Sequence, residues 1–207
     1  MVLGKIITAL KELSTPWIYE KMTLFGKNFS VTKRMILAYL HVKPTDITLD
    51  FGCGTGFYCR LFKPENYIGF DLDAKRINRA RRRYPRYKFH TMDVRKPMFK
   101  PRTFDHIMVV GIFHHINDES AEQALDNIRT LVKEKGDVVI LEPTLSETST
   151  NINRWMNLYD RGMYIRYRAQ YEEKFMRYFE HVEAHQFINE LFYNMYIYVL
   201  KKPRKQP

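Results

Sequence analysis

The chain has 207 residues, a length that favours one domain with extensions over two full domains. Hydrophobic residues make up 45% of it, which excludes a disordered or collagen-like protein. Its 34 lysines and arginines and 23 aspartates and glutamates give a net charge of +11, so the surface favours anionic partners such as nucleic acid, phosphorylated metabolites or acidic lipids.

Cysteine content and hydropathy give no sign of a disulfide framework, a zinc site or a transmembrane helix. Cys53 and Cys59 are too few for a disulfide framework, and their spacing matches no zinc pattern. No apolar run approaches the ~18 residues that a transmembrane helix needs. We therefore expect a single cytoplasmic domain over residues 1–207, without a metal site.

Hydrophobic periodicity predicts helices first and then an alternation of strands and helices. Residues 1–40 contain two helical stretches, and the first carries an apolar face at a period of 3.6 residues. From residue 47 onward, short apolar runs at 47–50, 67–71, 88–93, 104–110 and 137–142 are separated by helical patterns. Strands separated by helices indicate a parallel sheet.

Capping residues predict the bounds of two of these helices. Asp73 is the expected N-cap of a helix that Pro85 ends, and Asp118 is the expected N-cap of a helix that ends at Gly136. Two further apolar runs, at 182–188 and 193–200, are close enough to form a hairpin.

A glycine-rich loop follows the first predicted strand, where we expect a helix to begin. Its sequence is Leu49-Asp50-Phe51-Gly52-Cys53-Gly54-Thr55-Gly56. Glycines let a backbone turn tightly and approach a ligand at a helix N-terminus. The dinucleotide fingerprint Gly-x-Gly-x-x-Gly would need a glycine where Phe57 stands. Asp50 would repel a pyrophosphate, but it suits a ligand that carries an ammonium and a sulfonium.

With these residues the chain resembles the class I S-adenosylmethionine-dependent methyltransferases, most closely over 31–142. The resemblance continues with Asp71, 21 residues after Asp50, and with Asp93, 22 residues further. An acid at the first spacing is placed to bind ribose hydroxyls, and in the family the second position meets the adenine amino group. The run 104–111 looks like the family's fourth strand and ends at Gly111.

This resemblance implies a fold, a cofactor and a set of contacts. The fold is an α/β, Rossmann-like three-layer sandwich whose seven-stranded, mostly parallel sheet has the order 3-2-1-4-5-7-6 and one antiparallel strand. The methyl donor is S-adenosyl-L-methionine, S-adenosyl-L-homocysteine is its product, and no metal is needed. The residues expected to contact the donor are Asp50, Gly52, Cys53, Gly54, Gly56, Asp71, Leu72, Asp93, Val94 and Gly111.

Catalytic residues are less well defined, because methyl transfer mainly requires alignment of the reacting atoms and exclusion of water. If the acceptor needs a base, the candidates are His115, Glu142, Asp160 and Tyr164. Packing or capping is the favoured interpretation of His114 and His115, although one of them can line the acceptor side of the pocket. We expect residues 1–40 and 145–175 to form a lid over the donor.

The acceptor is not named by the sequence. We favour an O, N or C nucleophile on a small molecule, a lipid or a glycan intermediate, because no nucleic-acid-binding module is evident. The alternatives are an RNA methyltransferase that uses the basic residues of 75–88, and a non-catalytic module that only binds the donor. A nicotinamide oxidoreductase is disfavoured by Phe57.

Overall fold

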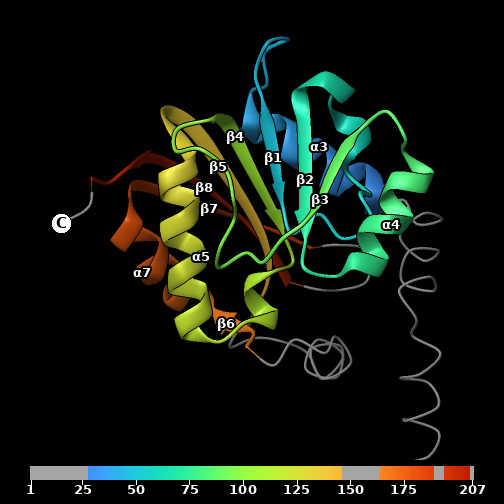
Figure 1. Ribbon diagram of the computed structural model, residues 1–207. Coiled ribbons are helices and arrows are strands. Elements are labelled where there is room, and N and C mark those ends of the chain that lie inside the picture. Colours follow the sequence, from blue (N-terminus) through green and yellow to red (C-terminus); the bar gives the residue numbers. More distant parts are fainter. Residues whose placement is uncertain (1–27, 146–163, 189–193, 206–207) are drawn as a thin grey trace, which may run out of the picture.

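The computed structural model describes residues 28–145, 164–188 and 194–205. Its centre is one twisted sheet with helices on both faces (Figure 1). In chain order the elements are α3 (Asn28–Leu40), β1 (Thr48–Phe51), the 3₁₀ helices η1 (Cys59–Leu61) and η2 (Pro64–Asn66), β2 (Tyr67–Asp71), α4 (Ala74–Arg83), β3 (Lys88–Thr91), β4 (Phe104–Val110), the 3₁₀ helix η3 (Phe113–His115), α5 (Asp118–Leu131), β5 (Val132–Leu145), β6 (Arg166–Tyr167), α7 (Arg168–Tyr178), β7 (Phe179–Ile188) and β8 (Asn194–Pro203).

The strand order of the sheet confirms the topology expected from the sequence. It is β3-β2-β1-β4-β5-β8-β7, with β8 antiparallel to both neighbours and the pairs among β1 to β5 parallel. The sheet has one more strand than expected, because the two-residue β6 pairs with the end of β5. Numbered without β6, the order is the predicted 3-2-1-4-5-7-6.

Alternating side chains give the sheet two apolar faces. In β4, Ile107 and Val109 point to the face covered by α5 and α7, whereas Met108 points to the face covered by α3 and α4. This period of two is the one that a strand between two layers requires. Each helix contributes an apolar stripe, and a fully buried aliphatic side chain such as Leu125 of α5 contributes about 1.5–3 kcal/mol to folding.

Two predicted helix ends are wrong, and both have a local reason. The N-cap of α5 is Asn117, whose side chain accepts a hydrogen bond from the Ser120 amide at 3.0 Å, and Asp118 is the first helical residue. The helix ends at Leu131, so Gly136 lies inside β5. A Cβ on Gly136 would lie 2.5 Å from the Asp105 carbonyl oxygen, so this glycine permits close approach of two strands and does not end a helix. The predicted cap at Asp73 is confirmed.

The helix expected directly after the glycine loop does not form. Turns follow the loop, and the helical turns between β1 and β2 are η1 and η2. The 15-residue connection between Phe51 and Tyr67 is therefore made of loop and 3₁₀ turns, and no α-helix begins within it. The hairpin predicted near the C-terminus is present as β7 and β8, longer than the apolar runs indicated.

The lid prediction falls mostly outside the described residues, which exclude 1–27 and 146–163. Of the first segment, α3 packs Ile36 and Leu40 against the sheet, and Tyr39 stacks on His185 with ring centroids 4.7 Å apart. Of the second, β6 and the first turns of α7 are described. The single-domain assignment for 1–207 and the lid itself stay predictions.

Candidate functional site

The residues expected to contact the donor gather at one edge of the sheet. β1, β2, β3 and β4 are parallel neighbours, so their carboxyl ends lie side by side (Figure 1). The glycine loop follows β1, Asp71 ends β2, Asp93 follows β3 and Gly111 follows β4. Ligands of open α/β sheets bind outside this edge.

The glycine loop has a backbone that only glycine adopts easily. Gly52, Gly54 and Gly56 have φ angles of 83°, 54° and 74°. A Cβ on Gly56 would lie 2.6 Å from the Phe89 ring, so this glycine lets the loop pack on β3. A Cβ on Gly54 would meet nothing within 4 Å, so the loop faces open space there.

Asp71 holds the loop in place. One carboxylate oxygen accepts a hydrogen bond from the Gly54 amide at 2.9 Å, and the other accepts one from the Asp73 amide, also at 2.9 Å. The side chain is 8% exposed. A carboxylate has lone pairs for further donors, so Asp71 can both order this edge and bind a hydroxyl.

Asp50 lies beneath the loop and is 2% exposed. The hydroxyl of Tyr67 donates a hydrogen bond to its Oδ2 at 2.7 Å. Burial raises the pKa of Asp50 to about 7; the Tyr67 hydrogen bond opposes this shift, and the nearby charge of Asp71 adds to it. Asp50 is therefore a carboxyl whose charge depends on what lies next to it near neutral pH.

Leu72 and Asp93 present different surfaces at the same edge. Leu72 is 64% exposed and follows the buried Asp71 directly, so its apolar side chain faces solvent at this edge. Asp93 accepts hydrogen bonds from the Arg95 amide at 2.9 Å and from the Arg95 Nε at 3.0 Å, which lower its pKa. An adenine contact by Asp93 would share this carboxylate with Arg95.

Glu142 holds the loop that leaves β4. It is fully buried, and its Oε1 accepts hydrogen bonds from the Ile112 and Phe113 amides, both at 2.8 Å. Its Oε2 accepts one from the His114 amide at 3.2 Å and lies 2.6 Å from His114 Nδ1. With both oxygens taken by this loop, Glu142 has the geometry of a positioning residue and not that of a base.

Arg166 holds the carbonyl groups of the same loop. Its Nη1 donates to the Phe113 carbonyl at 2.6 Å and its Nη2 to the Ile116 carbonyl at 3.0 Å, while the side chain is 7% exposed. Nη1 also donates to the Tyr164 carbonyl at 3.0 Å, and the Tyr164 amide donates to the His114 carbonyl at 3.0 Å. Residues 112–116, called the β4–α5 loop below, are thus held by a buried anion and a buried cation.

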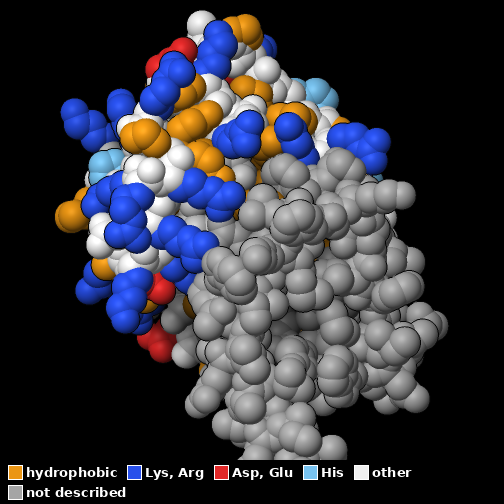
Figure 2. All heavy atoms as spheres, turned by 90° about the vertical axis from the view of Figure 1, so that its right-hand side faces the viewer, with side chains coloured by type: hydrophobic (Ala, Val, Ile, Leu, Met, Phe, Trp, Pro, Cys, Tyr) orange, Lys and Arg blue, Asp and Glu red, His pale blue; other side chains and the backbone are white. Residues whose placement is uncertain are grey.

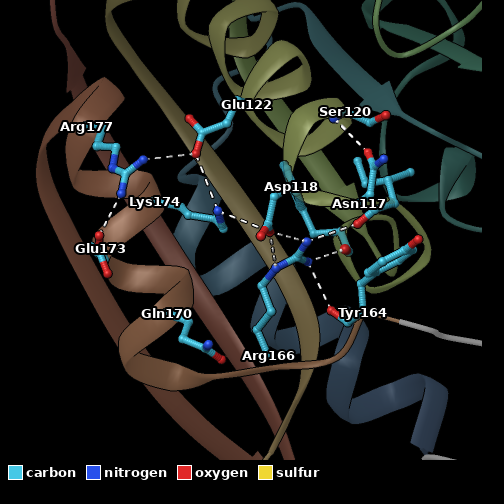
Figure 3. A network of polar contacts seen from close by, with 12 residues as sticks. Asn117, Asp118, Ser120, Glu122, Tyr164, Arg166, Gln170, Glu173, Lys174 and Arg177 are labelled. Carbon is cyan, nitrogen blue, oxygen red and sulfur yellow. Dashed lines mark hydrogen bonds and ion pairs between the residues drawn. The ribbon is translucent and has the colours of Figure 1, made fainter.

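Arg166 continues into a network between α5 and α7 (Figure 3). Asp118 accepts from Arg166 at 2.8 Å and pairs with Lys174 at 3.1 Å, and these contacts lower the pKa of Asp118. Glu122 pairs with Lys174 at 3.4 Å and with Arg177 at 3.3 Å. A hollow of about 290 Å³ borders the network and is lined in part by Tyr164.

The remaining candidates are dispersed. His114 is buried against Glu142, as the packing interpretation expects, whereas His115 is exposed. Asp160 lies outside the described residues. Burial raises the pKa of the Cys53 thiol well above its ordinary value, which fits Cys53 as apolar filling of the loop. Among the described residues, no cluster of three His, Cys, Asp or Glu side chains could hold a metal ion.

Two important residues escaped sequence reasoning. In the sequence, Tyr67 is an ordinary strand residue, and Arg166 is part of no pattern noted above. The partners of Tyr67 and Arg166 are 17 and 48 to 53 positions away, beyond the reach of local patterns. One signal for Tyr67 was available: a glycine inside a strand, here Gly69, often marks a close approach. A Cβ on Gly69 would lie 2.8 Å from the Tyr67 hydroxyl.

The strand order together with glycines and acids at the carboxyl ends of β1 to β3 defines a domain of the class I methyltransferase type. The comparisons agree: residues 48–136 match a family model described as a methyltransferase domain. The resemblance noted from the sequence is thereby confirmed, with the subfamily unassigned.

Two relatives match large parts of the chain. A protein of Methanocaldococcus jannaschii is 25% identical over 135 residues, which are 65% of this chain and 52% of the relative, so the chain spans about half of that protein's length. A methyltransferase of Alkaliphilus oremlandii is 24% identical over 90% of this chain and 84% of its own.

Among solved structures, phosphoethanolamine N-methyltransferase 2 of Haemonchus contortus in complex with S-adenosyl-L-methionine matches with a TM-score of 0.71. It is 18% identical, and the match covers 90% of this chain and 57% of that one, which shows a common fold. In the described part of the chain, no helix has the length and hydrophobicity to span a membrane.

Proposed function

We propose that this chain transfers the methyl group of S-adenosyl-L-methionine to a small-molecule, lipid or glycan acceptor. The observation that carries the proposal is the edge at which the glycine loop, Asp71 and Asp93 meet on a sheet of methyltransferase topology. Gly54 opens onto free space, Leu72 offers an exposed apolar side chain for a flat base, and Asp71 has acceptor capacity for ribose hydroxyls.

The donor supplies a methyl group already activated by its sulfonium, so the protein has to position and desolvate the reactants. In this proposal Asp71 orients the ribose, and Asp50 provides negative charge beneath the glycine loop. The β4–α5 loop, held by Glu142 and Arg166, forms a rigid wall beside Gly111. Tyr164 and His115 remain the candidates for contact with the acceptor, and Asp160 lies outside the described residues.

Calorimetry with S-adenosylhomocysteine, S-adenosylmethionine and NAD tests the donor assignment. We expect micromolar binding of the first two compounds and none of NAD. Asp71→Ala removes an acceptor of charged hydrogen bonds and should weaken S-adenosylhomocysteine binding by about 1–3 kcal/mol. Asp137→Ala is the control: its partly buried side chain lies 4.0 Å from His106 near the start of β4, away from the edge where Gly111 lies, so this variant should bind as the wild type does. Unchanged affinity in a folded Asp71→Ala protein would contradict the ribose contact.

Turnover separates an enzyme from a binding module. Incubation of the protein with donor labelled in the methyl group and with fractionated small molecules, lipids and RNA should transfer label to one class of acceptor. Tight donor binding without any transfer would favour a module that only binds the donor.

One observation favours RNA as a second candidate acceptor. The outer face of α4 and the segment after it carry exposed basic residues, and Figure 2 shows lysine and arginine side chains gathered on this side of the molecule. Replacing Arg79, Arg82, Arg83 and Arg86 by glutamine should leave small-molecule methylation unchanged. If RNA is the acceptor, the same variant loses RNA affinity and its salt dependence together.

A further inference from the structure

A buried tyrosine and a buried acid form a pair beneath the glycine loop. Tyr67 begins β2 and Asp50 lies in β1, in register with Gly69. A Cβ on Gly69 would lie 2.8 Å from the Tyr67 hydroxyl and 2.9 Å from Cys53 Sγ. Gly69 thus leaves room for the tyrosine to lie along the sheet and reach Asp50 Oδ2 at 2.7 Å.

Aromatic neighbours fix the direction of this hydroxyl. The Tyr67 ring stacks on Phe62 with centroids 5.8 Å apart, and it makes edge contacts with Tyr87 at 5.6 Å and Phe89 at 5.8 Å. Burial, together with the nearby charge of Asp50, raises the pKa of Tyr67 well above its ordinary value. The hydroxyl therefore keeps its proton and acts as a donor.

The groups around Asp50 leave its charge finely balanced. Burial opposes ionisation, the Tyr67 hydroxyl favours it, and Asp71 at the end of β2 opposes it. The thiols of Cys53 and Cys59 also face this acid, and burial raises the pKa of both, that of Cys59 to about 12, so they contribute no charge near neutral pH. A cation bound over the glycine loop would shift this balance toward the carboxylate.

We propose that Tyr67 is a positioning residue for the methyl donor: its hydroxyl orients Asp50 and favours the carboxylate form that receives the donor's ammonium, so that donor binding releases a proton from Asp50 to solvent. This inference rests on the proposed function, because it needs a ligand that carries an ammonium. According to this inference, Tyr67 contributes to donor binding through Asp50, and the donor affinity depends on pH.

The test compares two ligands and two variants across pH. S-adenosylhomocysteine carries the ammonium, whereas 5′-methylthioadenosine has the same nucleoside and a thioether but no amino-acid group. Tyr67→Phe removes the hydroxyl and keeps the ring. Tyr87→Phe is the matched control, because its hydroxyl donates to the Phe62 carbonyl at 3.0 Å in the same aromatic cluster.

Tyr67→Phe should bind S-adenosylhomocysteine about tenfold more weakly near pH 7, and the midpoint of its affinity should move up by about one pH unit, because a hydrogen bond to a charged group is lost. Its affinity for 5′-methylthioadenosine should not change, and Tyr87→Phe should behave as the wild type with both ligands. An unchanged pH profile in Tyr67→Phe would overturn the inference, and so would an equal loss for both ligands.

A measurement on the wild-type protein does not depend on the folding of any variant. Calorimetry in buffers of different ionisation enthalpy should show release of part of a proton when S-adenosylhomocysteine binds at about pH 6.5, and this release should fall toward zero by about pH 8, where Asp50 is already ionised and the amino group of the ligand is still protonated. Binding without proton exchange at any pH would refute the coupling while the proposed function stands. If neither ligand binds the wild type, the proposed function itself fails.

Discussion

Glu142→Gln tests the assignment of Glu142 as the residue that holds the β4–α5 loop. Each carboxylate oxygen serves two donors: the Ile112 and Phe113 amides on one side, and the amide and ring of His114 on the other. In glutamine one of these oxygens becomes an NH₂ group, which cannot accept a hydrogen bond from an amide; on the His114 side it also requires the ring to change tautomer, so that Nδ1 accepts. Two hydrogen bonds to a charged acceptor are worth about 3–6 kcal/mol, and relief of burying a charge offsets part of this, so we expect a net loss of about 3 kcal/mol.

Urea and thermal unfolding measure this loss. For a chain of this length, about 3 kcal/mol lowers the melting temperature by about 6–12 °C. Glu134→Gln, on an exposed position of the same strand, is the control and should change stability by less than about 0.5 kcal/mol. If Glu142→Gln were as stable as this control, the loop would not depend on the carboxylate.

Three further changes probe other parts of the site. Asp50→Asn removes a carboxyl whose pKa is raised by burial to about 7. The folded state holds the proton of this carboxyl more tightly than the unfolded chain does. The free energy of unfolding of the wild type, relative to that of the variant, should therefore fall as pH rises from about 4 to about 7 and level off above, and unfolding curves measured across pH test this. Gly54→Ala should lower the free energy of unfolding by about 1–2 kcal/mol because of the positive φ at this position alone. Gly56→Ala should lower it by more, since its Cβ would meet the Phe89 ring at 2.6 Å. Equal losses for the two variants in urea unfolding would contradict the packing argument. Arg166→Lys keeps the charge but loses the planar guanidinium that reaches several carbonyl groups, so the free energy of unfolding should fall by about 2–4 kcal/mol and the melting temperature should fall with it. An unchanged melting temperature would show that Arg166 does not stabilise the β4–α5 loop.

The sheet, and the edge at which Asp71, Asp93 and the glycine loop meet, were predictable because their sequence signals are local and periodic. Alternating apolar runs located the strands, and the spacing of Asp50, Asp71 and Asp93 located their carboxyl ends. The predicted helix ends were wrong where the sequence allows two solutions. Asn117 and Asp118 are both good N-cap residues, and Gly136 suits a helix end as well as a close contact between strands. Only the packing of the folded chain decides between such options.

The buried charges escaped prediction for a different reason. Glu142 and Arg166 form hydrogen bonds with backbone groups of the β4–α5 loop. Every residue has such backbone groups, so the sequence pattern does not show which of them a buried charge contacts. Glu142 reads as a candidate base because a carboxyl at the end of a strand suits that role, and its burial with four donors becomes visible only when strand and loop are assembled. A charged residue in or next to an apolar strand is thus a candidate for hydrogen bonding to buried backbone groups of a neighbouring loop.

The position of β8 has a consequence for the order in which the protein is made. β8 is synthesised after β7, yet it inserts between β5 and β7. Until β8 has left the ribosome, β5 therefore presents an open edge next to the most apolar part of the sheet, and such an edge pairs readily with other chains. That edge stays without its strand partner for at least the time needed to add about sixty residues, at about 5–20 residues per second.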